Sequence, residues 1–188
     1  MTIKRIFFIA GFVIIVVVGI IGYLATLNHY IIGDNFVKYL QKSVGKQLVL
    51  QKELKATYDN KNFNVILCTP VGGPGSETYV QVYEEKMNGM YYKPTYGARK
   101  GGSRSIYGMI MNYFEDGSNN NFEVVYGYNE DFKADRYEVK KVNSEGVIVE
   151  DISGQNYFLK TFQDIMYPEI TFRDRNNKDI TNFFNNSI

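Results

Sequence analysis

The stretch 78-TYVQVYEEKMNGMYYKPTY-96 decides the fold of this chain. Tyr and Val alternate over Thr78–Glu85, which predicts a strand whose two faces meet different surroundings. Asn88-Gly89 is a strong signal for a two-residue hairpin turn, and a second strand follows over Met90–Tyr96. Strands joined by so short a turn pair antiparallel. The centre of the chain is therefore predicted to form an antiparallel sheet.

Short runs of β-branched and aromatic residues, divided by Gly, Asn and Asp, continue on both sides of this hairpin. A second hairpin turns at Asp116-Gly117. Three further runs read as a meander. The remaining predicted strands are single. The predicted ranges are 107–115 and 121–128 for the second hairpin, 136–142, 147–152 and 156–162 for the meander, and 62–68 and 169–174 for the single strands.

Helices are predicted only in a few places of the part that follows Leu27. Asp34 is a candidate N-cap for a short amphipathic helix, and Gly45 suits its left-handed C-terminal end. The segment 47–58 fits either a helix or a strand, and the tail from Asp179 is predicted to close with a short helix. We therefore predict an α+β class: an N-terminal transmembrane helix followed by a β-rich extracytoplasmic domain with antiparallel sheet and one or two short helices.

The N-terminal segment Ile6–Leu27 is apolar without interruption by a charge. It exceeds the about 20 residues that a membrane-spanning helix needs, and Lys4 and Arg5 before it place the N-terminus in the cytoplasm. A cleaved signal peptide is the alternative, although its apolar region is normally shorter. The sequence thus predicts a cytoplasmic segment 1–5, a signal anchor 6–27 in the cell membrane, and an extracytoplasmic domain 28–188.

Composition excludes several classes of protein. The 188 residues are 45% hydrophobic and contain one Cys and one His, so a disulfide scaffold and a His/Cys zinc site within one chain are both excluded. All basic residues except Lys4 and Arg5, and all acidic residues, lie beyond Leu27. That part is close to neutral, so no general attraction for nucleic acid is expected. No sequence motif indicates a metal or a cofactor.

The glycine-rich stretch 97-GARKGGSRS-105 is the candidate binding segment. Arg99, Lys100, Ser103 and Arg104 combine cations and a hydroxyl with exposed main-chain N–H groups, which suits a phosphate or carboxylate such as that of an anionic cell-surface polymer. It matches no P-loop or dinucleotide fingerprint. A flexible solvated loop is the alternative interpretation, and the same stretch is a candidate boundary between two subdomains.

Tyrosines are abundant, and Tyr91, Tyr92 and Tyr96 form a candidate interaction surface. Tyr rings give rigid amphipathic contact area at recognition surfaces, and they also fill the faces of antiparallel sheets. Because the chain has no Trp, both roles stay open.

Catalytic constellations are not found in the sequence. Cys68 ends an apolar strand, so it is expected to be buried, with a disulfide between two chains as the alternative. The acidic pairs, of which Glu130-Asp131 is one, are expected to be solvated turns. The segment Asp174–Asp179 lacks the Gly of a calcium loop and is expected to be a hydrophilic turn. No catalytic residue and no metal ligand is therefore assigned.

The function predicted from these observations is binding or scaffolding at the cell surface, without enzymatic activity, through a protein partner or an anionic polymer. A structural subunit of a membrane transport or secretion assembly is the alternative. An extracellular hydrolase that uses two carboxylates is a third hypothesis. Oligomeric state and ligand identity do not follow from the sequence.

Overall fold

The structure is a computed structural model, and it describes residues 3–26, 31–32, 35–58, 60–72, 77–100, 107–113, 121–140, 146–163 and 168–185. The helices are α1 (Ile3–Thr26), α2 (Phe36–Val44) and α3 (Thr181–Asn185). The strands are β1 (Ile31–Ile32), β2 (Leu48–Tyr58), β3 (Lys61–Pro70), β4 (Thr78–Lys86), β5 (Tyr91–Lys100), β6 (Tyr107–Tyr113), β7 (Asn121–Tyr128), β8 (Arg136–Lys140), β9 (Val147–Asp151), β10 (Tyr157–Gln163) and β11 (Glu169–Arg173).

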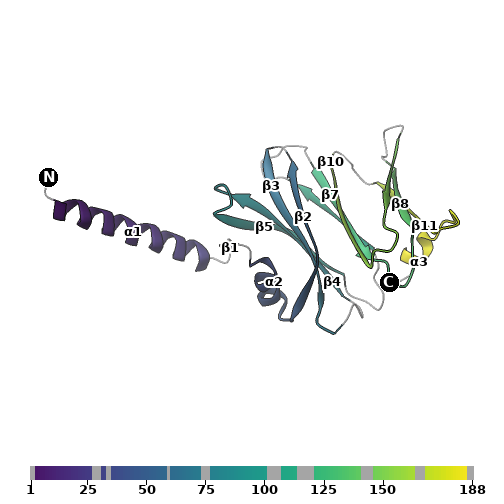
Figure 1. Cartoon of the computed structure of the whole chain (residues 1–188), viewed down its shortest axis with the longest axis horizontal. Coiled ribbons are helices and arrows are strands. Elements are labelled where there is room, and N and C mark those ends of the chain that lie inside the picture. The colour runs from purple at the N-terminus through teal and green to yellow at the C-terminus, as the bar shows by residue number, and fades with distance from the viewer. Residues whose placement is uncertain are drawn as a thin grey trace.

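The described strands form three sheets. The five-stranded sheet has the order β1-β5-β4-β3-β2, the middle sheet β10-β7-β6, and the outer sheet β11-β8-β9. All the strand pairs described are antiparallel. The predicted α+β class is therefore wrong, because the chain is mostly antiparallel β-sheet and its few helices lie beside the sheets or apart from them (Figure 1). Local turns and period-two runs dominate the sequence beyond residue 47, which leaves little chain for helices.

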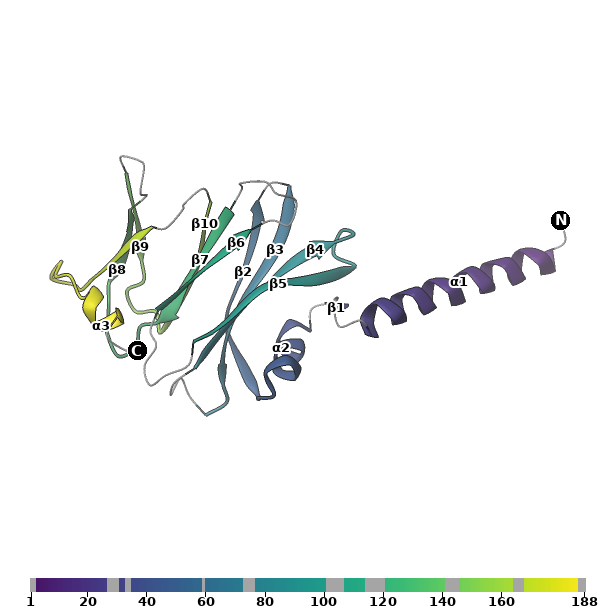
Figure 2. The same cartoon turned by 180° about the vertical axis from the view of Figure 1, so that it is seen from behind.

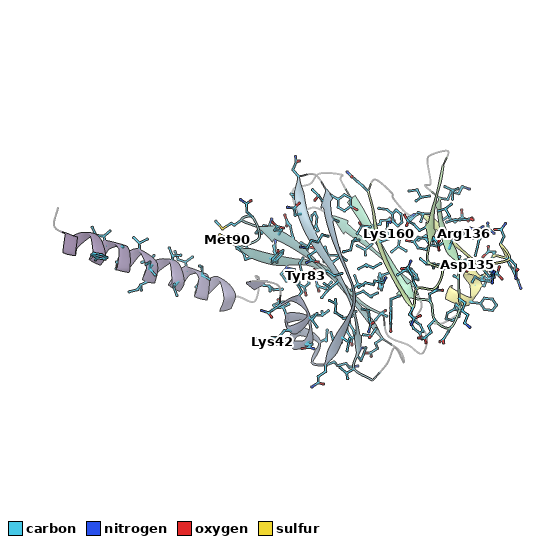
Figure 3. All side chains as sticks on the ribbon, viewed as in Figure 1. Lys42, Tyr83, Met90, Asp135, Arg136 and Lys160 are labelled. Atoms are coloured by element: carbon cyan, nitrogen blue, oxygen red, sulfur yellow. The ribbon has the colours of Figure 1, made fainter. Side chains whose placement is uncertain are left out.

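The first layer of the core lies between α2 and the five-stranded sheet. Phe36 and Leu40 of α2 pack on Ile66, Cys68 and Tyr83 of the sheet. The rings of Phe36 and Tyr83 are 4.8 Å apart, and the Tyr83 hydroxyl donates to the main-chain oxygen of Phe36 over 3.2 Å. Figure 3 shows Tyr83 in the sheet beside α2. Helix α2 therefore covers one face of the five-stranded sheet at these residues.

The opposite face of the five-stranded sheet packs against the middle sheet. Val65 and Leu67 of β3 and Val82 of β4 meet Val124 and Tyr126 of β7. Because Ile66 and Cys68 face α2 while their neighbours face the middle sheet, β3 is buried on both sides over 63–69. A strand covered on both faces shows a continuous apolar run instead of alternation.

The middle sheet is also covered on both faces. Val124 belongs to the layer shared with the five-stranded sheet, and its neighbour Val125 packs toward the outer sheet. Tyr137, Phe158 and Phe172 form the centre of that second interface, with ring centroids 5.5 to 5.8 Å apart. The result is a stack of α2, the five-stranded sheet, the middle sheet and the outer sheet (Figures 1 and 2).

The first predicted hairpin is confirmed, because β4 pairs with β5 across Asn88-Gly89, both of which have positive φ angles. The strand pairing of the second is confirmed by β6 and β7, but its predicted turn at Asp116-Gly117 lies outside the described residues. The predicted meander is only partly confirmed. β8 pairs with β9, but β10 leaves β9 and pairs with β7, with Tyr157 opposite Tyr128.

Burial on both faces explains the position of β10. Phe158 and Phe162 pack on the outer sheet, and Leu159 packs on the layer shared with the five-stranded sheet. Such a strand buries both its faces only in the middle of the stack. β11 then pairs with β8, and α3 confirms the predicted short C-terminal helix.

Helix α2 follows the prediction at its end and departs from it at its start. Gly45 has a φ of 71° and its N–H donates to Gln41 O over 2.9 Å, as a left-handed C-cap requires. The helix follows Asn35, whose side chain makes no capping bond, whereas Asp34 lies outside the described residues. The ambiguous segment 47–58 is the strand β2, which is bulged between Leu50 and Lys52.

The prediction of a transmembrane signal anchor over Ile6–Leu27 is wrong. α1 runs from Ile3 to Thr26 and projects away from the sheets (Figures 1 and 2). Among the described residues, no helix is both long enough and apolar enough to cross a membrane. The predicted single-pass location in the cell membrane has no support from the structure.

Candidate functional site

A pocket of about 280 Å³ lies where two loops of the stack meet. One loop connects β7 to β8 and the other connects β9 to β10. The pocket lies at the end of the molecule that carries Asp135, far from the β4–β5 hairpin tip marked by Met90 (Figure 3). Its lining residues are Asn129, Glu130, Lys133, Ala134, Asp135, Gly154, Gln155 and Asn156.

Asn129 forms the rigid base of the first loop. It is only 2% exposed. Its Nδ2 donates to Ala134 O over 2.9 Å and to Ile152 O over 3.3 Å, and its Oδ1 accepts the N–H of Ala134 over 2.8 Å. The main-chain oxygen of Asn129 also accepts the N–H of Lys133. The loop is thus closed around one buried amide side chain, as turns built on Asn commonly are.

The second loop is held equally firmly. Asp151 Oδ1 accepts the N–H of Ser153 over 2.8 Å and its hydroxyl over 2.6 Å. The Gln155 N–H donates to Ile152 O, and Gly154 has a φ of 68°, where a residue without a Cβ is favoured. The hydrogen bonds to the Asp151 carboxylate, chiefly that of the Ser153 hydroxyl, lower the pKa of Asp151.

Main-chain hydrogen bonds join the two loops to each other. The Asn129 N–H donates to Asn156 O over 2.8 Å, and the Ile152 N–H donates to Asp135 O over 2.9 Å. Together with the bond from Asn129 Nδ2 to Ile152 O, they fix the distance across the pocket. The pocket is therefore formed before any ligand arrives.

Charged and amide groups surround the opening. The hydroxyl of Tyr128 donates to Glu130 Oε2 over 2.7 Å. Burial and this carboxylate raise the pKa of Tyr128, so the hydroxyl stays protonated. Lys52 of β2 donates to Gln155 Oε1 over 3.3 Å, which ties the rim to the five-stranded sheet. Glu130, Lys133 and Asp135 supply charges of both signs.

The pocket can hold a small polar molecule. Its volume is close to the lower end of the range of ligand sites. The lining offers carboxylates, an ammonium group and amides, which are donors and acceptors of hydrogen bonds. None of the lining residues carries a hydroxyl, thiol or imidazole group, so Glu130, Asp135 and Lys133 are the only lining side chains that could act as an acid, a base or a nucleophile.

The predicted basic segment is described only in part. Arg99 and Lys100 belong to β5, where their main chains pair with Tyr79 and Thr78. Ser103 and Arg104 lie outside the described residues, as does the rest of 101–106. Anion binding by these four residues and a subdomain boundary at 97–105 therefore stay predictions.

Two of the three tyrosines of β5 are half-buried, and the side chain of Tyr96 lies outside the described residues. Tyr92 is half-buried, pairs with Ile31, and its ring meets that of Phe36 edge-on at 4.7 Å. Tyr91 is half-buried opposite Ile32, and the main chain of Tyr96 pairs with Val82. Tyr92 thus takes part in the core beside α2. The interaction surface predicted for the three tyrosines stays a prediction.

Cys68 is buried and free, as expected. It lies in the core beside α2 and has no exposed surface. Burial raises the pKa of its thiol to about 12. Among the described residues no group of three or more His, Cys, Asp or Glu could hold a metal ion. In the turn after β11, Asp174 Oδ1 accepts the N–H groups of Asn176 and Lys178, both over 2.9 Å, as a hydrophilic turn would.

Sequence reasoning identifies the turns of the pocket but not the pocket itself. By sequence alone, Glu130-Asp131 is a solvated acidic pair and Ser153-Gly154 is a strand connection. The one available signal is Asn129, a polar residue directly after an apolar strand. Its burial depends on Ala134 and Ile152, and the contact with Ile152 crosses between two loops.

In comparisons with known proteins, no protein-family model, curated protein or solved structure matches the chain.

Proposed function

We propose that the protein is a non-catalytic binding module that takes up a small polar ligand in the pocket between the β7–β8 and β9–β10 loops. The observation that carries this proposal is the pocket of about 280 Å³, lined by charged and amide side chains and closed by hydrogen bonds between its two loops.

Preorganisation supports a role in binding. The loops are held by Asn129 from one side and by Asp151 from the other. A ligand that enters such a pocket does not have to order the loops, so less of its interaction energy is lost to conformational entropy. Loops on a rigid sheet scaffold are also the usual place for recognition.

The charges of the rim favour a zwitterion of about the size of an amino acid. The carboxylates of Glu130 and Asp135 attract an ammonium group, and the ammonium group of Lys133 attracts a carboxylate. The amides of Gln155 and Asn156 add donors and acceptors for the remaining polar atoms. A purely anionic ligand would meet two carboxylates at the rim.

Ligand-observed NMR of the full chain with single free amino acids as probes tests the proposal. We expect saturation transfer to at least one amino acid. The double variant Glu130→Gln with Lys133→Gln removes one charge of each sign from the pocket and should abolish the signal. The matched control, Glu169→Gln with Lys42→Gln, removes the same charges from exposed positions and should preserve it. A signal that survives in the pocket variant would contradict this site.

A second candidate function is that of a subunit in a larger protein assembly, and α1 is the observation that favours it. Phe7, Phe12, Ile15 and Val18 are each more than 60% exposed, and residues 12–20 are all exposed. Consecutive exposed residues cover every side of a helix, and monomers rarely leave so large an apolar surface uncovered. Apolar helices of other subunits would cover it.

A photocrosslinking amino acid in place of Ile15 tests this second function in cells that express the full chain. We expect discrete crosslinked protein products, because Ile15 is 71% exposed on α1. The same substitution at Met90, which is 63% exposed on the β4–β5 hairpin, is the control. Equal products from both positions, or none from Ile15, would contradict the assembly function.

A further inference from the structure

The strand β9 is an edge of the outer sheet. In the part of the chain that the structure describes, β9 pairs with β8 alone. Its sequence is Val-Ile-Val-Glu-Asp, and Val147 and Val149 are 53% and 55% exposed. Natural edge strands are protected by Pro, a bulge, short length or charged side chains, of which Lys is the most common. β9 contains no Pro, Lys or bulge, and its only charged residues are the acidic Glu150 and Asp151.

The face that each residue of β9 presents is settled by its neighbours. Ile148 packs on the core between the middle and outer sheets, and Glu150 forms an ion pair with Lys160 of β10 at 2.9 Å. Val147, Val149 and Asp151 therefore point to the opposite, outward face. The strand is anchored from inside and offers two valines and one carboxylate outside.

We propose that β9 pairs antiparallel with β9 of a second copy of the chain, centred on Val149, so that two outer sheets join into one continuous sheet. The two chains are then related by a two-fold axis, and each contributes the same surface. Val149 lies opposite Val149 of the second copy, and Val147 lies opposite Asp151 of the second copy.

The alternation of side chains along β9 and the charges of its residues select this register. Only registers that place Val147, Val149 and Asp151 on the same outward face in both chains leave Ile148 in both cores. A centre at Glu150 would put two carboxylates directly opposite each other, which is unfavourable. A centre at Ile148 would leave Asp151 outside the paired strand. The centre at Val149 uses the whole strand Val147–Asp151.

Charge complementarity favours a second copy over an unrelated strand. In β8, Arg136 is the neighbour of Asp151 and Lys140 is the neighbour of Val147. In the proposed pair, each Asp151 lies between Arg136 of its own chain and Lys140 of the second copy. The main chains of Asp151 and of that Lys140 are two strand spacings, or about 10 Å, apart. The stem of Lys140 can cover Val147, and its ammonium group, which lies 4.0 Å from Glu169 in its own chain, can reach that carboxylate as well. The same arrangement repeats on the other side of the axis.

Disulfide trapping of the full chain tests both the partner and the register. In Val149→Cys, the two introduced cysteines lie directly opposite each other, with Cα atoms about 4.5 to 5.5 Å apart, which suits a disulfide. In the control Val147→Cys, the two cysteines are separated by about four residues along the strands, or about 13 Å, and cannot bond. The native Cys68 has no exposed surface and stays out of the reaction.

The expected result is a covalent dimer of the Val149→Cys protein on mild oxidation, with at least tenfold less dimer from the Val147→Cys protein. Both substitutions are at exposed positions, and a circular dichroism spectrum like that of the parent chain shows that each variant is folded. Equal dimer from the two variants would overturn the register. No dimer from Val149→Cys would overturn the pairing, and it would leave a foreign strand as the occupant of the edge.

Discussion

Asn129 and Ala134 are bonded to each other twice: the Asn129 side chain donates to Ala134 O over 2.9 Å and accepts the Ala134 N–H over 2.8 Å. Both residues are buried. These two hydrogen bonds close the β7–β8 loop between Asn129 and Ala134. The pocket depends on that closure, because five of its lining residues lie between 129 and 135 and so belong to this loop.

Replacing Asn129 by Ala should destabilise the fold by about 3 kcal/mol, because the substitution removes the partners of the buried N–H and C=O groups of Ala134 and one of the two hydrogen bonds to Ile152 O. Urea unfolding followed by circular dichroism measures the change. Asn182→Ala on the exposed side of α3 is the control and should change the free energy of unfolding by less than about 0.5 kcal/mol. Equal effects of both substitutions would show that the loop is not held by Asn129.

Phe172 is predicted to be a principal core residue of the outer sheet. It has no exposed surface and packs against Tyr137 and Phe158 with ring centroids 5.7 and 5.8 Å away. Phe172→Ala should cost about 3 to 5 kcal/mol in the free energy of unfolding, since it leaves a cavity between two sheets. Phe183→Ala, at a position 57% exposed, is the matched control. A loss under about 1 kcal/mol at Phe172 would place the core elsewhere.

Glu138 links stability to pH. The hydrogen bond from Arg173, 2.6 Å long, lowers the pKa of Glu138 below its ordinary value of 4.5, and Arg136 contributes further. A carboxyl group with a lowered pKa stabilises the fold above its ordinary pKa, and the contribution disappears as the pH falls through the folded-state pKa. Glu138→Gln should therefore destabilise the protein by about 1 kcal/mol at pH 7, and the difference should vanish in acid.

Thermal unfolding of the parent chain and of Glu138→Gln between pH 3 and pH 7 is the measurement. Glu169→Gln is the control, because its carboxylate is 72% exposed and lies 4.0 Å from Lys140. That control should follow the parent chain at each pH. A difference between Glu138→Gln and the parent that grows toward low pH would contradict a lowered pKa of Glu138 in the folded protein.

Cys68 should resist alkylation in the folded protein. Burial raises the pKa of its thiol from 9.0 to about 12, which lowers the thiolate fraction near neutral pH by about a thousandfold, and the side chain has no exposed surface. Mass spectrometry after iodoacetamide treatment should show no adduct without urea and one adduct in urea. In Val71→Cys, at a position 59% exposed, one adduct should form at once. Rapid labelling of Cys68 would mean that the layer under α2 opens readily.

Much of the local structure could be predicted from particular residues. Asn88-Gly89 predicted the β4–β5 hairpin because few residue pairs adopt positive φ angles so readily, and Gly45 predicted the end of α2 for the same reason. The residues 62–68 predicted a strand, and the apolar end of that strand predicted the burial of Cys68. Each of these features depends on residues close together in the chain, so the conformation that those residues favour locally is also the one found in the folded protein.

The pairing of β10 and the pocket could not be predicted in this way. Phe158 and Leu159 show that both faces of β10 are apolar, but they do not show which sheets cover them. Adjacent strands in the sequence usually pair, so the meander was the simplest expectation. Pairing with β7 places β10 in the middle sheet, where both of its faces are covered at once. Pairing with β9 would not cover both faces.

The sequence by itself determined the Asn88-Gly89 turn, the end of α2 and most of the strands, because turn chemistry and side-chain period act over a few residues; it left 47–58 open between helix and strand. The tertiary structure alone decided that β10 lies beside β7, that Asn129 reaches Ile152, and that a polar pocket forms between two loops. Those choices depend on how three sheets stack to remove apolar surface from water, which no short stretch of sequence specifies.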